Sequence, residues 1–424
     1  MSIISDNPFI YGDPVSPEQF VNRQREVRKL VGRICTGQSS AVIGDPRSGK
    51  TSLLRYVQQP ALYGDHASRL LFSYLDAQML GTTFAPPHFW EYVLQPVSNL
   101  DRSTYPQVRT AYHTCQRESF GNFGLERLFA HLHQAGHCLV LLLDEFDNLL
   151  DNAAFHQAEF FGGLRSLASR SAGLVLVLAS RQAPGDLNRK TEEFSRSGSP
   201  FFNIVSEITL KPFSQRATNE LLARAGRDFI PADREFIIRL ADGHPYFLQV
   251  AAGELWELRE EADLTPEERR QSAGEALYHK AEDTLRDTWR LWQPEMQIAF
   301  AIIALNQSPA LLGEREFNLQ RLREKLADYT PETKQLAKRG YIRGSSDDGW
   351  RVTGEVMLWF VADTLVQALR TDSELGALFR AQCWDGLFTK EEREQFKDAV
   401  QSLRALLKDN VDNFVKVASL IKGG

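Results

Sequence analysis

The stretch AVIGDPRSGKTSLLRYV, residues 41–57, decides the fold that we expect for this chain of 424 residues. It places Gly44 and Gly49 between a short apolar run and a segment whose apolar residues recur at helical spacing. Lys50 and Thr51 follow directly, which completes the spacing G-x-x-x-x-G-K-T. The stretch therefore predicts a buried strand, a tight loop and a helix, in that order.

A loop of this kind is typical of a phosphate-binding site. Glycines allow several backbone N–H groups to point at one anion, and the N-terminus of the next helix adds partial positive charge. In this pattern the lysine contacts the β- and γ-phosphates of a nucleotide, and the threonine hydroxyl binds Mg²⁺. We therefore expect ATP and Mg²⁺ here, and a glycine-rich turn without a ligand is the alternative. The nucleotide-binding residues expected in the loop are Gly44, Asp45, Pro46, Arg47, Ser48, Gly49, Lys50, Thr51 and Ser52.

A second apolar strand ends in acidic residues, in the stretch CLVLLLDEFDNLL at residues 138–150. Its five consecutive apolar residues indicate a central parallel strand that is buried on both faces. Asp144 follows at the carboxyl end, where α/β sheets bind their ligands, and we expect it to hold Mg²⁺ through water together with Thr51. Glu145 is expected to orient or deprotonate the attacking water, with Asp147 as the next candidate for this base. An acidic helix start without such a role is the alternative.

A third strand, GLVLVLASRQ at residues 173–182, ends in Ser180 and Arg181. Arg181 is expected to sense whether ATP or ADP is bound, whereas an ordinary surface arginine is the alternative. Two further strands are expected within residues 69–78 and 202–210, and the alternation of strands and helices predicts a parallel sheet. The expected catalytic residues are Lys50, Asp144, Glu145 and Arg181.

The order of these motifs resembles a known family, the archaeal-ATPase-like branch of the STAND and AAA+ P-loop ATPases. Its relatives include the NACHT and apoptotic-type switch ATPases and, more distantly, the replication-initiator ATPases. The resemblance covers about residues 7–365. It rests on NPFIYGDPVSPEQFVNRQREV at 7–27, GDPRSGKT at 44–51, LLLDEFDNLL at 141–150, LASR at 178–181, ITLKPFS at 208–214 and GHPYFLQ at 243–249.

The resemblance implies further nucleotide contacts. Arg23 would help to frame the adenine, although Asn22 stands where the family usually has a glycine. Asparagine is one of the few residues that tolerate a left-handed backbone, so the turn is expected to persist. Pro245, in the GHP motif of the lid, would lie against the nucleotide, and we expect His244 to be locally hydrogen-bonded and not catalytic.

The family also uses an arginine supplied by a neighbouring subunit when it assembles. Three residues are candidates for this role, and the sequence does not choose between them: Arg165, Arg170 and Arg196.

The resemblance and the helical patterns together predict an α/β fold in four parts. A P-loop ATPase domain with a parallel sheet is expected in residues 1–213, and a helical lid that begins with Ser214 as N-cap in residues 214–284. Two short strands after a helix indicate a winged-helix domain in residues 285–366. A small helical C-terminal unit, with Thr389 as a helix cap, is expected in residues 367–424.

The composition argues against several classes of function, namely overall nucleic-acid binding, zinc or redox chemistry at paired cysteines, and membrane insertion. The formal net charge of -6 gives no overall electrostatic reason to bind nucleic acid. The four cysteines, at positions 35, 115, 138 and 383, form no close pair that would indicate a zinc or redox motif. No apolar run approaches the roughly 18 residues of a membrane span, and the N-terminus lacks a signal pattern. We therefore expect a cytoplasmic protein without membrane contact.

Two functions from different classes fit these patterns. The first is a STAND-type regulatory switch that hydrolyses ATP, forms a homo-oligomer and recruits or activates a separate partner protein. The second is a DNA-binding AAA+ ATPase that acts through its winged helix. Lys334, Lys338 and Arg339 favour DNA contact, whereas Asp347 and Asp348 at the tip of the wing oppose it. A nucleotide-binding scaffold with little turnover is a third alternative.

Overall fold

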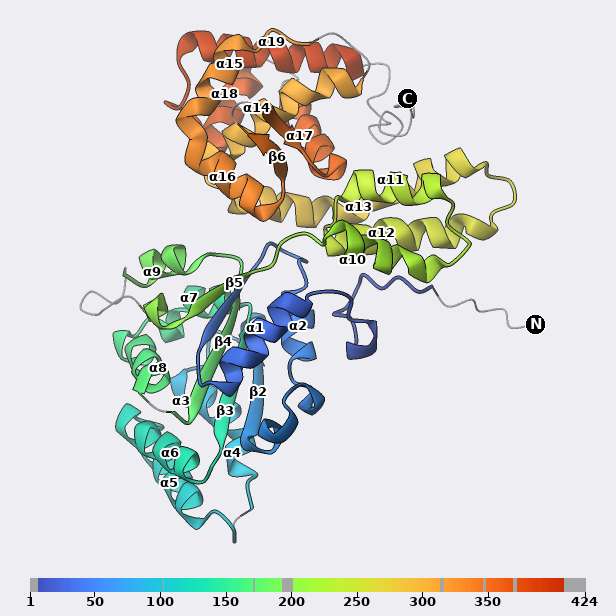
Figure 1. Cartoon of the computed structure of the whole chain (residues 1–424). Coiled ribbons are helices and arrows are strands. Elements are labelled where there is room, and N and C mark those ends of the chain that lie inside the picture. Colours follow the sequence, from blue (N-terminus) through green and yellow to red (C-terminus); the bar gives the residue numbers. More distant parts are fainter. Residues whose placement is uncertain are drawn as a thin grey trace. The chain divides into compact units, whose positions relative to one another are not determined.

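The computed structural model describes residues 7–101, 103–170, 172–192, 201–312, 316–345, 348–368 and 372–407. The chain forms two compact units (Figure 1). The sheet unit comprises Pro14–Asp45 and Gly49–Leu210, and the helical unit comprises Met1–Asp13, Pro46–Ser48 and Lys211–Gly424. Arg196, Asp347 and the last residues of the expected C-terminal unit lie outside the described residues.

Five parallel strands form the sheet in the order β2-β3-β4-β1-β5. This sheet confirms the α/β class, because every expected strand is present. The strands are β1 (Ser40–Ile43), β2 (Leu70–Asp76), β3 (Cys138–Asp144), β4 (Leu174–Ser180) and β5 (Ser206–Thr209). The helices of this unit are α1 (Gln24–Cys35), α2 (Lys50–Tyr56), α3 (Pro86–Val93), α4 (Gln95–Ser98), α5 (Pro106–Arg117), α6 (Asn122–Gln134), α7 (Phe146–Asp151), α8 (Ala158–Arg170) and α9 (Pro184–Glu192).

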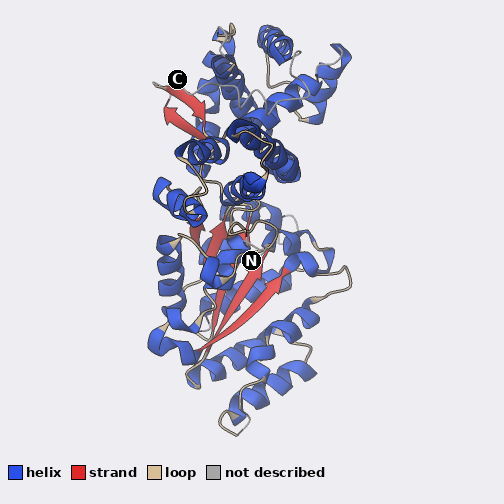
Figure 2. Cartoon of the chain, turned by 90° about the vertical axis from the view of Figure 1, so that its right-hand side faces the viewer, coloured by secondary structure: helices blue, strands red, loops and turns tan. Residues whose placement is uncertain are grey.

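Helices cover both faces of the sheet (Figure 2). Along β3, Leu139, Leu141 and Leu143 join a core that includes residues of α3, α6 and α8. Val140 and Leu142 point to the opposite face and join a core with residues of α1 and α2. Each fully buried side chain of this size contributes about 1.5–3 kcal/mol. Because both faces are apolar, polar groups gather where the strands end.

The helical unit contains one antiparallel hairpin, β6 (Ile342–Ser345) with β7 (Gly349–Val352), among its described residues. Ser214 and Thr389 cap helices as the sequence predicts, since each accepts a hydrogen bond from a backbone N–H three residues later. The helices are α10 (Gln215–Leu222), α11 (Pro231–Ala241), α12 (Pro245–Glu257), α13 (Pro266–Leu291), α14 (Pro294–Leu311), α15 (Gln320–Lys325), α16 (Thr330–Arg339), α17 (Glu355–Ala368), α18 (Asp372–Ala381) and α19 (Lys390–Leu407).

Two of the expected domain boundaries fall inside helices. The boundary after residue 284 lies within α13, and the boundary after residue 366 lies within α17. α13 carries buried residues on both sides of position 284, whereas the buried residues of α17 end at Val366, two residues before the helix ends. α19, the last helix that the structure describes, packs against α14, α15 and α17 and therefore shares the core of the elements before it.

Residues 7–11 lie along α12 within the helical unit. Asn7 donates to the Gly253 carbonyl at 3.1 Å and to Glu257 Oε1 at 2.7 Å, and the Tyr11 hydroxyl donates to Glu254 Oε1 at 2.6 Å. Phe9 is buried and its ring stacks on Phe229. Residues 7–13 of the first motif of the resemblance therefore belong to the helical unit, whereas its residues 14–27 belong to the sheet unit.

Two expectations about the chain as a whole can be compared with the structure. All four cysteines are free thiols, as the spacing predicted. None of the helices in the described part of the chain has the length and apolar character required to span a membrane.

A buried carboxylate in the helical unit makes stability depend on pH. Burial raises the pKa of Glu355, at the start of α17, to about 7 from its ordinary 4.5, although Arg239 Nε lies 3.7 Å from Glu355 Oε2. The folded state therefore binds the Glu355 proton more tightly than the unfolded state does. The protonated carboxyl stabilises the folded state fully below pH 4.5, and this stabilisation is lost as the pH rises through 7. We expect the unfolding free energy to fall by about 2–3 kcal/mol between pH 5 and 8 from this group.

Urea unfolding at several pH values checks this expectation. Glu355→Gln should remove the dependence, whereas Glu391→Gln, at an exposed position of α19, should keep it. Parallel pH curves for Glu355→Gln and the unaltered protein would contradict it.

Candidate functional site

The carboxyl ends of four neighbouring strands bring the expected catalytic segments together. The phosphate-type loop follows β1. Ser180 ends β4, which lies next to β1 in the sheet, and Arg181 follows it. Asp144 ends β3, and Asp76 ends β2 directly opposite it in the strand register. The Gly44 N–H donates to the Ser180 carbonyl at 3.1 Å, so the loop and the end of β4 are joined by a backbone hydrogen bond.

The loop has the backbone that its glycine spacing predicts. Gly49 has φ +94° and is the N-cap of α2, a conformation that glycine adopts without strain. Arg47 is also left-handed, with φ +59°, and its Nη1 donates to the Gly12 carbonyl at 3.1 Å. Ser52 Oγ accepts a hydrogen bond from the Val15 N–H at 3.3 Å, which ties α2 to the segment before α1.

The Lys50 side chain is buried and folds back over the loop. Its Nζ donates to the carbonyls of Gly44 at 3.1 Å and Asp45 at 3.2 Å. The same nitrogen lies 3.9 Å from Glu145 Oε1. The ammonium group is therefore held by weak neutral acceptors and one carboxylate, and a phosphate group is a stronger partner for it than the carbonyls are.

The Glu145 carboxylate lies between two cations. Arg181 Nη2 is 3.0 Å and Arg181 Nε is 3.1 Å from Glu145 Oε2, while Lys50 approaches the other oxygen. Glu145 itself has a left-handed backbone, with φ +45°, between β3 and α7. The structure thus brings together the residues that the sequence proposed as base and as sensor.

Asp144 is almost fully buried, at 1% exposure, and is held from two sides. Its Oδ2 accepts from the Tyr74 hydroxyl at 2.9 Å, and its Oδ1 accepts from the Glu145 N–H at 3.0 Å. Burial and the neighbouring carboxylate raise the pKa of Tyr74, so this hydroxyl keeps its proton and remains a donor. Thr51 follows Lys50 in the first turn of α2.

The donor set at this edge suits Mg²⁺ only in company with phosphates. No cluster of three or more His, Cys, Asp or Glu side chains arranged for a metal occurs among the residues that the structure describes. Mg²⁺ commonly binds through one or two protein oxygens, substrate phosphates and waters, and not through a complete protein cage. The Asp144 carboxylate and the Thr51 hydroxyl fit this mode.

Asp147 has a structural task that the sequence did not indicate. Its side chain is buried, with Oδ1 accepting from Ser180 Oγ at 3.0 Å and Oδ2 accepting from the Arg181 N–H at 2.8 Å. Both oxygens therefore hold the end of β4, which places Asp147 as the anchor of Arg181. The sequence signal for this task was a carboxylate three residues after Asp144, in the first turn of a helix.

Asp76 is a second residue that sequence reasoning missed. Burial is the main cause that raises its pKa, and the nearby carboxylates of Asp144 and Glu145 add to the effect. The edge of the sheet therefore concentrates negative charge. An acidic residue at the end of the stretch LLFSYLD was the signal for it.

Arg23 is buried in the sheet unit at the start of α1. Asn22 and Arg23 both have left-handed backbones, with φ +63° and +68°, so the tight turn expected at Asn22 is confirmed. Burial lowers the pKa of Arg23 to about 10. Its contact with adenine stays a prediction.

The remaining candidates lie on other elements. Pro245 is the first residue of α12. Gly243, two residues earlier, has φ +81°, and a Cβ added to it would lie 2.5 Å from the Phe213 carbonyl oxygen. The His244 ring stacks on Phe247 with centroids 4.1 Å apart. Arg165 and Arg170 are on α8. The roles of Pro245 at the nucleotide and of these arginines in a neighbouring subunit stay predictions.

Comparison with known proteins gives one family and several similar folds. A family model described as an AAA-like domain matches residues 14–321. The chain is similar to a Walker-type ATPase of Pyrococcus abyssi, with 18% identity, coverage of 81% of this chain and 96% of that chain, and a TM-score of 0.51. No curated protein matches the chain.

Two other solved structures are similar at lower scores. The ORC2 protein of Aeropyrum pernix has 16% identity, coverage of 86% of this chain and 97% of that chain, and a TM-score of 0.48. A STAND protein with a tetratricopeptide repeat sensor from Pyrococcus horikoshii has 14% identity, coverage of 98% of this chain and 56% of that chain, and a TM-score of 0.31. At these identities the Pyrococcus abyssi structure shows a shared fold, and the two lower scores add nothing to it.

The anchoring task of Asp147 can be tested by stability. Asp147→Ala should lower the unfolding free energy by about 2–3 kcal/mol, because two donors at the end of β4 lose their buried acceptor. Asp151→Ala is the matched control on the same helix, since Asp151 is exposed and forms an ion pair with the half-buried Lys190, and should cost less than about 1 kcal/mol. Urea unfolding followed by circular dichroism measures both changes, and equal losses would refute the anchoring task.

Proposed function

This chain belongs to the AAA-like domain family, and on that premise we propose that it is an ATP-binding and ATP-hydrolysing switch. The observation that carries the proposal is the Glu145 carboxylate, which lies between Lys50 and Arg181 beside a phosphate-type loop. An anion that enters the loop competes for both cations at once. The site can therefore respond to the number of phosphates that it holds.

Phosphate binding would begin at the loop. The loop N–H groups and the Lys50 ammonium are donors, and the β- and γ-phosphates offer the ammonium more acceptor oxygens than the carbonyls of Gly44 and Asp45 do. Mg²⁺, held by Thr51 and Asp144, would neutralise part of the phosphate charge. Tyr74 keeps the Asp144 carboxylate oriented toward this edge.

The γ-phosphate would then separate Arg181 from Glu145. While Arg181 binds Glu145 Oε2, that oxygen is a poor proton acceptor, because its charge is already matched. When the guanidinium turns to the γ-phosphate, the carboxylate is free to accept a proton from water. Asp147 holds the Arg181 backbone during this change, so only the side chain has to move.

The switch that we propose acts on assembly. A ligand shifts a conformational equilibrium only by its differential affinity for the two states, and a change from 99:1 to 1:99 needs about 5.5 kcal/mol. A few charge-assisted hydrogen bonds to the γ-phosphate supply energy on that scale. We infer a STAND-type role in which the ATP form assembles with copies of itself and recruits a separate partner protein.

DNA binding through the β6–β7 hairpin is the second candidate function. One observation favours it, since Arg343 and Arg351 lie opposite each other in the hairpin. However, Arg343 Nη2 binds both oxygens of Asp242, at 2.7 and 2.8 Å, so its charge is already matched. DNA binding that falls steeply with salt concentration, as phosphate contacts require, would favour this function over the first.

Glu145→Gln tests the assignment of the base. We expect ATP affinity to be kept and turnover to fall by about 10²-fold or more, because the amide has the same shape but accepts no proton. Lys50→Ala is the contrasting variant and should lose ATP binding together with hydrolysis. Calorimetry and phosphate release measure the two quantities, and turnover equal to that of the unaltered protein would place the base elsewhere.

Arg181→Ala tests the coupling between the γ-phosphate and assembly. The Glu145→Gln protein with ATP should form a larger species than the unaltered protein with ADP. Adding Arg181→Ala should remove this difference while ATP still binds, because the residue that distinguishes the two nucleotides is gone. Light scattering in both nucleotide states measures the masses, and the same mass with ATP and ADP would count against the switch.

A further inference from the structure

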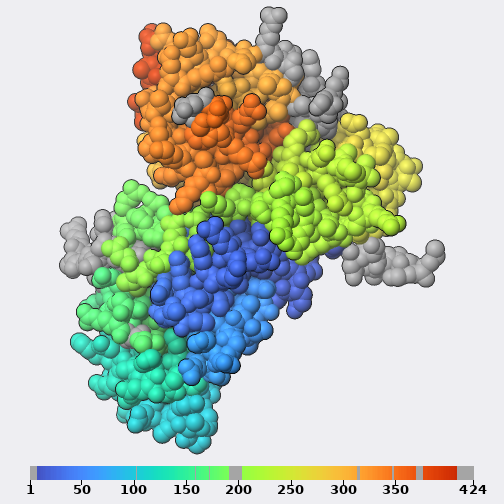
Figure 3. Space-filling model, viewed as in Figure 1, coloured from blue at the N-terminus to red at the C-terminus, as the bar shows by residue number. Residues whose placement is uncertain are grey.

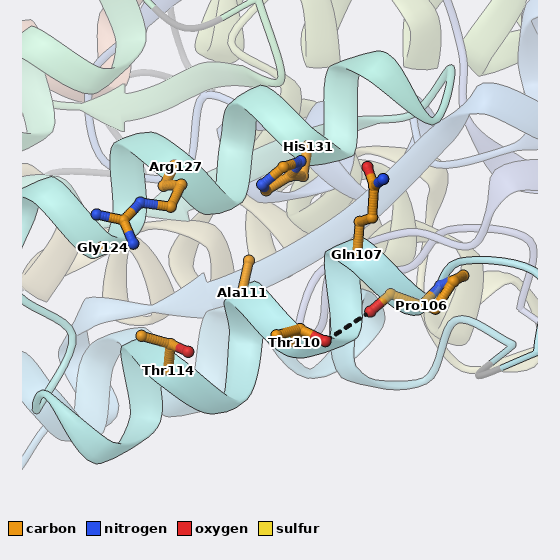
Figure 4. Close-up of a pocket in the computed structure, with 8 residues that line it drawn as sticks. All are labelled: Pro106, Gln107, Thr110, Ala111, Thr114, Gly124, Arg127 and His131. Atoms are coloured by element: carbon orange, nitrogen blue, oxygen red, sulfur yellow. Dashed lines mark hydrogen bonds between the residues drawn. The ribbon is translucent and has the colours of Figure 1, made fainter.

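Helices α5 and α6 form a hairpin between β2 and β3, and a cavity of about 290 Å³ opens between them (Figure 4). In Figure 3 the cyan to teal residues of this hairpin lie at the surface of the sheet unit. α5 lines the cavity with residues spaced for one helical face, and α6 lines the opposite wall. The lining residues are Pro106, Gln107, Thr110, Ala111, Thr114, Gly124, Arg127 and His131.

Two small residues create the space. Ala111 on α5 and Gly124 on α6 leave room where larger side chains would fill it. An added Cβ at Gly124 would lie 3.1 Å from Cys115 Sγ, so the glycine also lets the two helices approach closely. The cavity is therefore bounded by packed helices and not by a loop.

Among the residues that the structure describes, the polar lining offers donors and no carboxylate. Arg127 and Gln107 make no ion pair or side-chain hydrogen bond with any residue that the structure describes. The His131 Nδ1 atom is buried and likewise finds no partner within the described ranges. Buried polar atoms without a partner are rare and call for a bound water, ion or ligand. Thr110 differs, since its hydroxyl donates to the Pro106 carbonyl at 3.0 Å (Figure 4).

We propose that this cavity binds a small organic anion, with its phosphoryl or carboxyl group on Arg127 and His131. An arginine suits both groups, because its planar fork donates two parallel hydrogen bonds to either one. The carbon body of the ligand would lie against Ala111 and the methyl groups of the threonines. The volume is at the lower end of ligand sites, which favours a body of a few carbons.

One carboxylate outside the cavity limits the charge of the ligand. Glu118, which is exposed at the end of α5, has an oxygen that would lie 3.4 Å from a Cβ added at Gly124. It does not line the cavity, but it would repel a second anionic group. A ligand with one anionic group therefore fits better than a polyphosphate.

The hairpin also leads into the candidate catalytic site. Tyr105 precedes Pro106 of the cavity, and its ring packs edge-on against the His137 ring, with 4.9 Å between the ring centroids. His137 precedes β3, the strand that ends in Asp144 and Glu145. An anion that rigidifies α5 and α6 would therefore act on the start of this strand. This regulatory part rests on the proposed function, whereas the binding itself does not.

Calorimetry on the full chain without nucleotide tests the site. The probes are glycerol 3-phosphate and glycerate, which carry a phosphoryl and a carboxyl group on similar three-carbon bodies, and uncharged glycerol. We expect one of the two anions to bind with a dissociation constant of about 1 mM or below and glycerol not to bind. The anion that binds shows whether the cavity recognises a phosphoryl or a carboxyl group. If neither anion binds at a concentration about tenfold above 1 mM, the proposal is overturned.

Matched variants locate the binding. Arg127→Gln should weaken it at least about tenfold, because a charged donor is lost, and Thr114→Leu should block the cavity while it keeps both donors. Arg109→Gln is the control, since Arg109 is on α5 but does not line the cavity, and should change nothing. Equal losses for Arg109→Gln and Arg127→Gln would overturn the proposal.

The Lys50→Ala protein separates this site from the phosphate-type loop. It should bind the anion as the unaltered protein does, whatever the outcome for ATP. If Lys50→Ala abolishes the signal, the anion binds at the loop and the cavity has no such role. Failure of the hydrolysis or assembly experiments would leave the calorimetric result standing, so the two proposals fail separately.

Discussion

The contact of Glu145 with Lys50 and Arg181 is the interaction on which the candidate site depends. It joins residues that follow three different strands, and it exists because β4 lies between β1 and β3 in the sheet. A carboxylate between two cations is stable without a ligand but offers both cations to a stronger anion. The same charges that hold the site in place are therefore the ones that a nucleotide would rearrange.

The sheet imposes this arrangement through its apolar faces. Leu139 to Leu143 are buried on both faces of the sheet, so β3 carries only apolar side chains along this stretch, until Asp144 at its end. Asp76, Asp144, Glu145 and Arg181 consequently share one edge, where the carboxylates would repel one another without nearby cations and donors. Tyr74 satisfies Asp144 in this crowded place. The apolar packing of the sheet therefore determines where the charged side chains of the site can lie.

The long segment between β2 and β3 gives the sheet unit a second feature that the phosphate-type loop does not require. Its helices α5 and α6 pack closely through Gly124 and still leave a cavity where Arg127 and His131 Nδ1 find no side-chain partner among the described residues. If the chain acts as the ATP-dependent switch that we propose, a small anion at this hairpin would provide an input besides the nucleotide. The hairpin leads directly into β3, so both inputs would meet on the same strand.

The sequence by itself determined the strands, the loop and the place of Asp144, Glu145 and Arg181 at the sheet edge, because these depend on local periodicity and on fixed spacing. It also predicted the left-handed turn at Asn22 and the caps at Ser214 and Thr389. Only the tertiary structure decided that Asp147 anchors Arg181, that Arg181 binds Glu145, and that α13 and α17 run through expected boundaries. Those facts depend on which strands become neighbours and on how helices pack, and no periodicity within one segment records a contact with another.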